Sequence, residues 1–337
     1  MTLTFELPDW TDSLRPTQQT AINDVLAQFS TGSQIVFLEG PTGSGKTLIA
    51  EMVRQSLGLR AAYLCSSLAL QEQFQKDYPM AAILKGRSNY PTYDSPSSFG
   101  DTTIMLSTAD CTKTKTLLPA CQNCTRDSEG EEVKHCLWCH PVSLCPYEQA
   151  KAAAIRATLM CSNIYYFLYE ANYVGSVTTA RPFIIIDECD TLEDVFMSYV
   201  EVRLTARRAH DLGISTPTKK TVSSTWVQWL ADAIPQVRWH LDKVKPEMRH
   251  PNIKNIREYN FLTRLLGNLE RIADPVTGLV AGGWVYTGYN QGDIAFKPVL
   301  VAPFIHNLLW RHAKLFLLMS ATIISSDEMA LSLGVTR

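Results

Sequence analysis

The sequence lacks any apolar run long enough to cross a bilayer, which needs about 20 consecutive residues. Its N-terminus also lacks the basic segment and the apolar stretch that together mark a signal peptide. A membrane-spanning or exported protein is therefore not expected, and we predict an intracellular, cytoplasmic one.

A large charge of one sign is missing as well, because the formal net charge is −2 over 337 residues. The overall electrostatic field will not attract DNA, so any contact with nucleic acid must come from a local basic surface. The length is sufficient for a large core and for more than one domain.

A phosphate-binding loop stands out among the features that are present. Residues 40 to 47 follow the pattern G-x-x-x-x-G-K-[ST], whose backbone N–H groups surround the phosphates of a nucleotide. Residues 34 to 38, which are apolar after Gln34, predict a buried strand before it, and residues 48 to 53 predict a helix after it. The candidate nucleotide-binding residues are Gly40, Pro41, Thr42, Gly43, Ser44, Gly45, Lys46 and Thr47.

Within this loop the residue types suit different parts of a nucleoside triphosphate. Gly43 and Gly45 allow a close approach of the backbone and tolerate a positive φ. Lys46 is expected to reach the β- and γ-phosphates, and Thr47 to offer its hydroxyl to Mg²⁺. We therefore predict a nucleoside triphosphate and Mg²⁺ as ligands.

A second strand ends in acidic residues, as the other half of such a site requires. Residues 182 to 186 are apolar and rich in isoleucine, which indicates a strand buried on both faces. Asp187 is expected to hold Mg²⁺, and Glu188 to polarise the water that attacks the γ-phosphate. The simpler interpretation is a core strand that meets solvent at two carboxylates.

The cysteines divide into two groups. Cys65, Cys161 and Cys189 lie in or beside apolar strands and are interpreted as small buried residues. The other six fall within a short segment and indicate a metal site: Cys111, Cys121, Cys124, Cys136, Cys139 and Cys145. Paired C-x2-C units suit a zinc ion, and four of the six could equally hold an iron–sulfur cluster, since thiolates bind either metal.

The rest of the chain alternates between helical and extended patterns. Helices are predicted over residues 16–29, 147–157, 222–234 and 256–272, and Pro235 is expected to end the third of them. Strands are predicted over residues 61–66, 158–161, 283–286 and 315–319. Residues 91 to 135 are loop-rich, with clusters of Ser, Thr, Asp and Pro.

Taken in order, these motifs resemble the iron–sulfur superfamily 2 DNA helicases typified by XPD and DinG. The motifs that carry the resemblance are Arg15 with Gln18, similar to the adenine-side motif; the loop ending at Thr47; residues 66 to 71, where a DNA-contacting motif lies; the acidic box 187 to 190; and Ser320-Ala321-Thr322. The resemblance extends over nearly the whole chain.

The resemblance implies an α/β RecA-like P-loop fold with a parallel sheet and two insertions. The motor domain is expected over 1–85, 160–190 and 301–337, with a cysteine-rich insertion at 86–159 and a mostly helical one at 191–300. The implied function is that of the first motor domain of an ATP-dependent DNA helicase, which translocates 5′ to 3′ on single-stranded or forked DNA.

The resemblance also favours a 4Fe–4S cluster over zinc, because the insertion lies where the family carries its cluster. Cys139 and Cys145 are the firmest expected ligands. Cys136 and Cys111 complete the preferred set, with Cys121 and Cys124 as rivals.

Three departures from the family pattern are visible. Cys189-Asp190 replaces the commoner small residue and histidine, and Thr92 stands where relatives often carry a cysteine. The sequence ends soon after Thr322, so a second RecA-like domain is expected to be missing. This leaves two alternatives: a nucleotide- and DNA-binding half of a split helicase with little activity alone, or a zinc-ribbon P-loop ATPase that does not unwind DNA.

Overall fold

The computed structural model describes residues 6–86, 89–92, 104–105, 146–173, 175, 181–220, 222–249, 253–288, 292–323 and 325–335. The chain forms two compact units, Met1–Leu192 with Phe304–Arg337, and Glu193–Pro303. The six clustered cysteines lie outside the described residues, so their metal stays a prediction. No helix within the described ranges is long and apolar enough to span a membrane.

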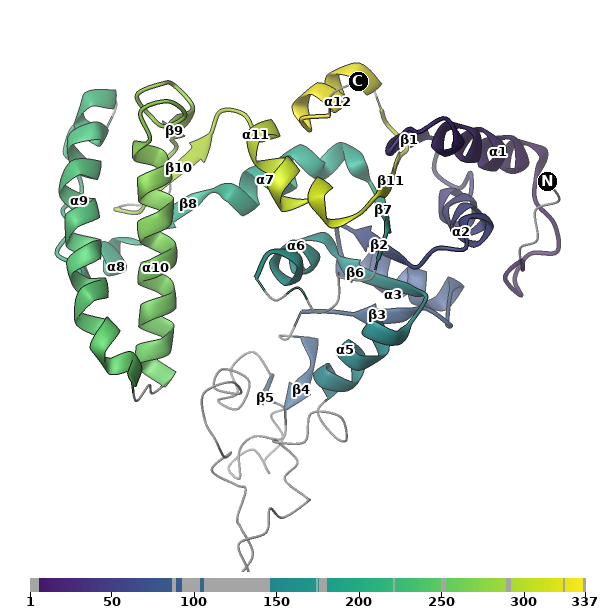
Figure 1. The fold of residues 1–337 in the computed structure, drawn as a ribbon, viewed down its shortest axis with the longest axis horizontal. Helices are drawn as coiled ribbons and strands as arrows, with labels where there is room; N and C mark the ends of the chain where they lie inside the picture. The colour runs from purple at the N-terminus through teal and green to yellow at the C-terminus, as the bar shows by residue number, and fades with distance from the viewer. Residues whose placement is uncertain are drawn as a thin grey trace, which may run out of the picture. The chain divides into compact units, whose positions relative to one another are not determined.

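The first unit is built on a six-stranded sheet in which every pairing is parallel (Figure 1). In spatial order the strands are β1 (Ile35–Glu39), β11 (Leu315–Ser320), β7 (Phe183–Asp187), β2 (Ala61–Cys65), β6 (Leu159–Asn163) and β3 (Ala82–Leu84). A short hairpin, β4 (Pro91–Thr92) and β5 (Ile104–Met105), lies apart from this sheet. The predicted α/β class with a parallel core sheet is confirmed.

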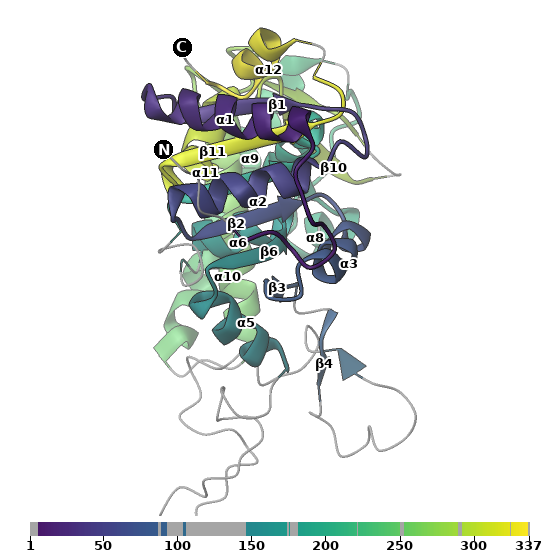
Figure 2. The same cartoon turned by 90° about the vertical axis from the view of Figure 1, so that its right-hand side faces the viewer.

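Helices cover both faces of this sheet, as apolar strands buried on two sides require. One face packs against α1 (Pro16–Ser30), α2 (Lys46–Leu57) and α3 (Leu68–Asp77), and Figure 2 shows α1 and α2 side by side over the strands. On the other face, α6 (Ile164–Tyr173) contacts β2 and β6, and Trp310 packs edge-on against Phe316 at 4.8 Å between ring centroids. The remaining helices of this unit are α5 (Pro146–Arg156), α11 (Ala302–Leu308) and α12 (Ser326–Ser332), with short 3₁₀ turns at Cys189–Thr191 and Trp310–His312.

A buried arginine holds the amino-terminal edge of the sheet together. Arg181 is only 3% exposed, and its guanidinium donates to the backbone oxygens of Ala61 at 2.7 Å, of Ala157 at 3.1 Å and of Ala154. Burial and the nearby Arg60 lower the pKa of Arg181 to about 10, so the group stays charged at neutral pH. It thereby fastens β2 to the end of α5, a helix that lies at the C-terminal end of the segment predicted as the cysteine-rich insertion.

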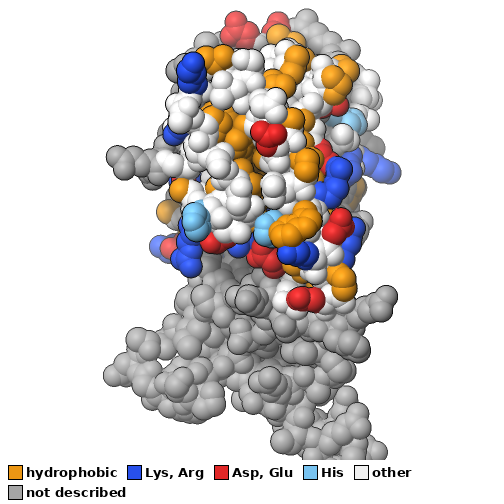
Figure 3. Space-filling view, turned by 90° about the vertical axis from the view of Figure 1, so that its left-hand side faces the viewer, with side chains coloured by type: hydrophobic (Ala, Val, Ile, Leu, Met, Phe, Trp, Pro, Cys, Tyr) orange, Lys and Arg blue, Asp and Glu red, His pale blue; other side chains and the backbone are white. Residues whose placement is uncertain are grey.

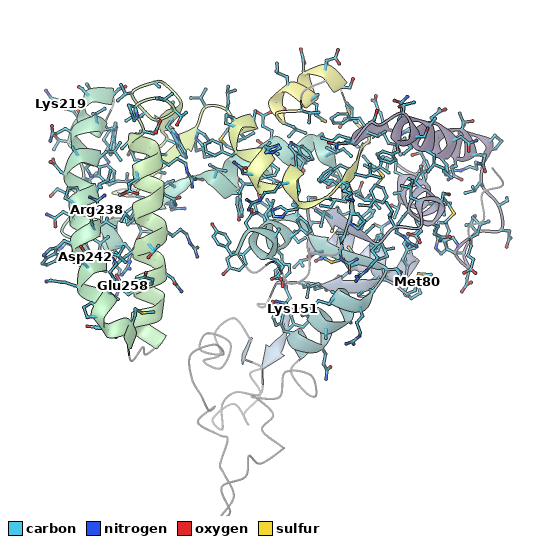
Figure 4. The ribbon with its side chains drawn as sticks, viewed as in Figure 1. Met80, Lys151, Lys219, Arg238, Asp242 and Glu258 are labelled. Carbon is cyan, nitrogen blue, oxygen red and sulfur yellow. The ribbon has the colours of Figure 1, made fainter. Side chains whose placement is uncertain are left out.

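A buried ion pair also fastens α5. Lys151, labelled in Figure 4, reaches the buried carboxylate of Glu170 on α6 at 3.3 Å.

Cys65, Cys161 and Cys189 are at most 1% exposed and not in disulfides, which confirms their interpretation as buried residues.

The second unit is a helical hairpin packed on a small sheet. Its elements are α7 (Leu192–Val200), β8 (Val202–Leu204), α8 (Ala206–Asp211), α9 (Ser223–Val244), the 3₁₀ turn Lys245–Arg249, α10 (Ile253–Ala273), β9 (Trp284–Tyr286) and β10 (Ile294–Pro298). The strands form an antiparallel sheet in the order β8-β10-β9. Trp226 of α9 stacks on Tyr286 at 4.1 Å and meets Phe296 edge-on at 5.3 Å, so aromatic rings join the helix to the sheet.

Ion pairs reinforce the surface of this unit. Figure 4 labels Arg238 on α9, which pairs with Glu270 of α10 at 2.7 Å, and Glu258 on α10, which pairs with Arg208 at 2.7 Å. On the face seen in Figure 3, apolar side chains gather toward the middle, and most charged side chains lie toward the edges.

The predicted end of a helix at Pro235 is wrong, because α9 continues through this residue to Val244. A proline in a helix removes one N–H and crowds the preceding turn. Ala233, Val237 and Leu241 are buried on the same side of α9, which makes extensive contacts with α10. Packing of this face before and after Pro235 outweighs the local cost of the proline.

Candidate nucleotide-binding site

The predicted motifs meet at the carboxyl edge of the six-stranded sheet. Since the strands are parallel, their carboxyl ends lie side by side, which is where ligands of open α/β sheets bind. The residue that follows each strand at this edge is Gly40 after β1, Ala321 after β11, Glu188 after β7, Ser66 after β2 and Ile164 after β6. Hydrogen bonds connect the ends of adjacent strands at this edge. Gly40 N–H donates to Ser320 O at 3.1 Å, and Asn163 Nδ2 donates to Ser66 O at 2.9 Å.

The loop between β1 and α2 has the conformation that its glycines allow. Gly43 and Gly45 have φ values of 78° and 85°, and Gly45 immediately precedes α2. Lys46 Nζ lies inside the loop, where it donates to Gly40 O at 2.7 Å. Ser44 Oγ is buried and has no hydrogen-bond partner among the described residues. An ammonium group at the helix N-terminus and an unsatisfied hydroxyl beside it fit an anionic ligand.

Arg15 and Gln18, predicted on the adenine side, donate hydrogen bonds to the backbone of the phosphate loop. Arg15 Nη2 donates to Gly43 O at 3.0 Å and to Ser44 O at 2.8 Å, and Gln18 Nε2 donates to Ser44 O at 2.9 Å. Gln18 Oε1 also accepts from the backbone N–H of Arg15, the N-cap residue of α1, at 2.9 Å. In this structure both side chains therefore contact the phosphate loop itself.

Asp187 and Thr47, the expected Mg²⁺ ligands, are joined through a residue that the sequence did not single out. The hydroxyl of Tyr63 donates to Asp187 Oδ2 at 2.7 Å and lies 3.2 Å from Thr47 Oγ1. Burial raises the pKa of Asp187, and its hydrogen bond from Tyr63 counteracts this increase. Burial and the charge of Asp187 raise the pKa of Tyr63 well above its usual value, so the phenol stays protonated.

Glu188 has a strained backbone conformation at the end of β7. Its φ of 53° and ψ of 49° are left-handed, and it is the one non-glycine residue with positive φ in the described part of the chain. Such a conformation costs on the order of 1–3 kcal/mol and is concentrated at functional sites. Ser66 Oγ donates to Glu188 Oε2 at 2.5 Å, so the residue after β2 fixes the direction of this carboxylate.

The last residue of the acidic box contacts the Ser-Ala-Thr motif. Ser320 Oγ donates to Asp190 Oδ1 at 2.5 Å, and Thr322 Oγ1 donates to Asp190 Oδ2 at 3.2 Å. Asp190 occupies the place where the family commonly has a histidine. Its two carboxylate oxygens bind both hydroxyls, so the two motifs are physically connected despite the departure.

The residues at this edge fit a nucleotide with Mg²⁺. Mg²⁺ prefers oxygen ligands, which the Thr47 hydroxyl and the Asp187 carboxylate supply. Lys46 and the N-terminus of α2 provide positive potential for phosphates. Within the described ranges, no group of three or more His, Cys, Asp and Glu side chains is arranged to hold a metal ion.

Tyr63, Ser66 and Asn163 are the residues whose contacts were not foreseen individually. Tyr63 sits in an apolar strand and is indistinguishable from a core aromatic residue in the sequence. Only the strand register reveals it: Tyr63 pairs with Ile185, so Asp187 lies two residues along the same face of the neighbouring strand.

Comparisons with known proteins agree with this fold. Residues 11–215 match the protein family described as the type III restriction enzyme, res subunit. A solved structure described as an XPD helicase has a TM-score of 0.53 and 14% identity, and the match covers 97% of this chain and 62% of that one. A truncated XPD has a TM-score of 0.52 and 13% identity, and the match covers 96% of this chain and 98% of that one.

These structural likenesses confirm the expected resemblance to XPD at the level of the fold. The chain thus spans less than two thirds of the XPD helicase structure but nearly all of the truncated one. No curated protein matches the chain significantly.

Proposed function

Since the chain belongs to the type III restriction enzyme res subunit family, we propose that it is an ATP-dependent motor domain of a DNA helicase. The observation that carries this proposal is the row of functional groups at one edge of the sheet. The phosphate loop, the Ser-Ala-Thr motif, the acidic box and Ser66 follow the adjacent strands β1, β11, β7 and β2.

In the proposed site, the loop binds the triphosphate and α2 directs its N-terminus at it. Lys46 Nζ would exchange its bond to Gly40 O for contacts with phosphate oxygens, which are stronger because both partners are charged. Thr47 and Asp187 would hold Mg²⁺, which neutralises phosphate charge when bound. Arg15 and Gln18 keep the loop in shape through Ser44 O.

We assign Glu188 as the residue that orients and polarises the attacking water. Its carboxylate is exposed, whereas Asp187 beside it is largely buried and bonded to Tyr63. Ser66 Oγ fixes one carboxylate oxygen of Glu188 and leaves the other for the water. The two neighbouring acids therefore have separate tasks, with Asp187 toward the metal and Glu188 toward the water.

Asp190 supports coupling of hydrolysis to movement along DNA. A change at the γ-phosphate that shifts the acidic box would pull on Ser320 and Thr322 through the two hydrogen bonds of Asp190. These residues end β11, and the Ser320 backbone oxygen also accepts from Gly40 at the start of the phosphate loop.

Single-stranded DNA is the proposed track, and α6 offers a surface that suits it. Tyr165, Tyr169 and Tyr173 recur every four residues and are 41%, 46% and 58% exposed. The rings of Tyr169 and Tyr173 lie 5.2 Å apart. Exposed aromatic rings stack with bases irrespective of sequence. Movement from 5′ to 3′ is proposed from the resemblance to XPD and DinG.

For the cysteine-rich insertion we propose a 4Fe–4S cluster held by Cys111, Cys136, Cys139 and Cys145. The second RecA-like domain is proposed as a partner, on the same polypeptide or another. Elemental analysis of anaerobically purified protein, with its visible absorption spectrum, separates iron–sulfur from the zinc-ribbon alternative. Stoichiometric zinc without iron or visible absorbance would support the latter.

The decisive assay is steady-state ATP hydrolysis with and without single-stranded DNA. We expect hydrolysis that DNA stimulates and that Glu188→Gln abolishes, while Mg²⁺·ATP binding is retained. Glu193→Gln, an exposed glutamate outside the site, is the matched control and should leave the rate unchanged. Nucleotide and DNA binding with negligible turnover, restored by a separately added second motor domain, would favour the split helicase.

A further inference from the structure

Tyr63 lies at the centre of the proposed metal site without belonging to any of its motifs. Its hydroxyl is 2.7 Å from Asp187 Oδ2 and 3.2 Å from Thr47 Oγ1. The three residues come from β2, β7 and α2. The phenol is thus the one group that contacts both expected Mg²⁺ ligands within the described residues.

Packing leaves the phenol of Tyr63 little freedom. The side chain is 3% exposed and lies among the apolar residues between the sheet and α1–α3. Its ring packs on Phe74 with centroids 4.3 Å apart, and Phe74 stacks in turn on Tyr78 at 5.0 Å. The hydroxyl is therefore held at a fixed place by a rigid aromatic stack.

The phenol of Tyr63 has a single proton, which determines the direction of its hydrogen bonds to Asp187 and Thr47. An ionised carboxylate only accepts, so the proton of Tyr63 is used for Asp187. The phenol oxygen is then an acceptor toward Thr47, and the hydroxyl proton of Thr47 must point at Tyr63. This orientation turns the free lone pairs of Thr47 Oγ1 away from the phenol, as a cation ligand requires.

The carboxylate of Asp187 is held at both oxygens. Oδ2 accepts from Tyr63, and Oδ1 accepts from the backbone N–H of Glu188 at 3.1 Å. Each carboxylate oxygen can accept more than one contact, so both retain capacity for a cation. With both oxygens held, the carboxylate cannot rotate out of position.

We propose that Tyr63 is a positioning residue that orients Thr47 and Asp187 for Mg²⁺, a conclusion that rests on the proposed function. Outer partners of metal ligands commonly change metal affinity by about 10- to 100-fold. Removal of the hydroxyl should therefore weaken Mg²⁺-dependent nucleotide binding and leave Mg²⁺-independent binding intact.

The test compares ATPγS affinity in Mg²⁺ and in EDTA for wild type, Tyr63→Phe and Tyr78→Phe. Tyr78 is a matched control, because it is 1% exposed in the same stack and its hydroxyl has no partner among the described residues. Tyr63→Phe should reduce the Mg²⁺/EDTA affinity ratio about tenfold or more. Tyr78→Phe should leave the ratio within about twofold, because its hydroxyl makes no hydrogen bond to lose. The ratio is taken within each protein, so an unfolded fraction lowers the number of sites and leaves the ratio unaffected.

A second variant makes the test independent of Tyr63→Phe alone. Thr47→Val also removes the Mg²⁺-oriented hydroxyl, so the effects of Thr47→Val and Tyr63→Phe should be less than additive in the double variant. The positioning role of Tyr63 would be overturned by additive effects, by a wild-type affinity ratio in Tyr63→Phe, or by equal weakening of binding in Mg²⁺ and in EDTA. None of these three results would overturn the proposed function. Failure of the wild type to bind the nucleotide would overturn the proposed function as well.

Discussion

Replacing Gly45 by alanine should destabilise the protein more than replacing Gly43, although both have positive φ. For Gly43 (φ 78°), an added Cβ meets nothing within 4 Å, so only the left-handed backbone opposes it. That conformation costs roughly 1–2 kcal/mol for a residue with a Cβ. For Gly45 (φ 85°), the same Cβ would lie 2.3 Å from Gln18 Nε2 and 3.3 Å from Arg15 Nη2.

The additional loss at Gly45 follows from the contacts of Gln18. This side chain is 4% exposed and must leave its place, which breaks its bonds to Ser44 O and to Arg15 N–H. Two hydrogen bonds contribute about 0.5–1.5 kcal/mol each, so Gly45→Ala should lose a further 1–3 kcal/mol or so relative to Gly43→Ala.

Urea unfolding of the two variants measures this difference, and nucleotide affinity measured alongside reports the shape of the loop. In a Gln18→Ala background the two glycine variants should become nearly equal, because the clash is gone. Equal destabilisation by the two glycine variants in the otherwise wild-type protein would show that a Cβ at position 45 does not displace Gln18.

Three further variants test other parts of the structure. Arg181→Met should lower the free energy of unfolding by about 3 kcal/mol or more in urea titrations, because it removes the guanidinium donor of the Ala61 and Ala154 backbone oxygens, whereas Ala157 O still accepts from Arg60; a loss below about 1 kcal/mol would contradict this. Asp293→Asn should lower the melting temperature at pH 7. Hydrogen bonds from Arg203 and from the Ala206 N–H lower the pKa of Asp293 in the folded protein, so the carboxylate stabilises the fold at pH values above its pKa in the unfolded chain. The difference in melting temperature between wild type and variant should vanish as the pH falls through the pKa of folded Asp293. A difference that does not depend on pH would refute this prediction. Tyr169→Ala should weaken single-stranded DNA binding by about 1–3 kcal/mol in fluorescence titrations, and an unchanged affinity would exclude α6 from the DNA path.

Local patterns were sufficient to predict most of the first unit. The strand before Gly40, the loop and the helix after it are encoded within a few residues, because glycines, Lys46 and flanking apolar runs each favour one conformation. The strand ending at Asp187 was predicted for the same reason, since a short isoleucine-rich run buried on both faces has few alternatives.

What the sequence did not predict depends on distant parts of the chain. Pro235 is a helix breaker by local rules, and only the packing of α9 on α10 overrides them. The contact of Tyr63 with Asp187 needs the strand order, which places β2 next to β7 although residues 61 and 187 are far apart in sequence. The left-handed conformation of Glu188 has no local signal, because glutamate disfavours it.

The most direct test of the proposed nucleotide site is calorimetric titration of residues 1–337 with Mg²⁺·ATPγS, for wild type and Lys46→Ala. Lys76→Ala, an exposed lysine on α3, is the matched control. We expect one site in the wild type, the same affinity in Lys76→Ala, and a loss of about 10- to 100-fold in Lys46→Ala, since a charged contact to phosphate contributes about 1.5–3 kcal/mol. Unchanged affinity in Lys46→Ala, or no binding by the wild type, would contradict a nucleotide site at this edge of the sheet.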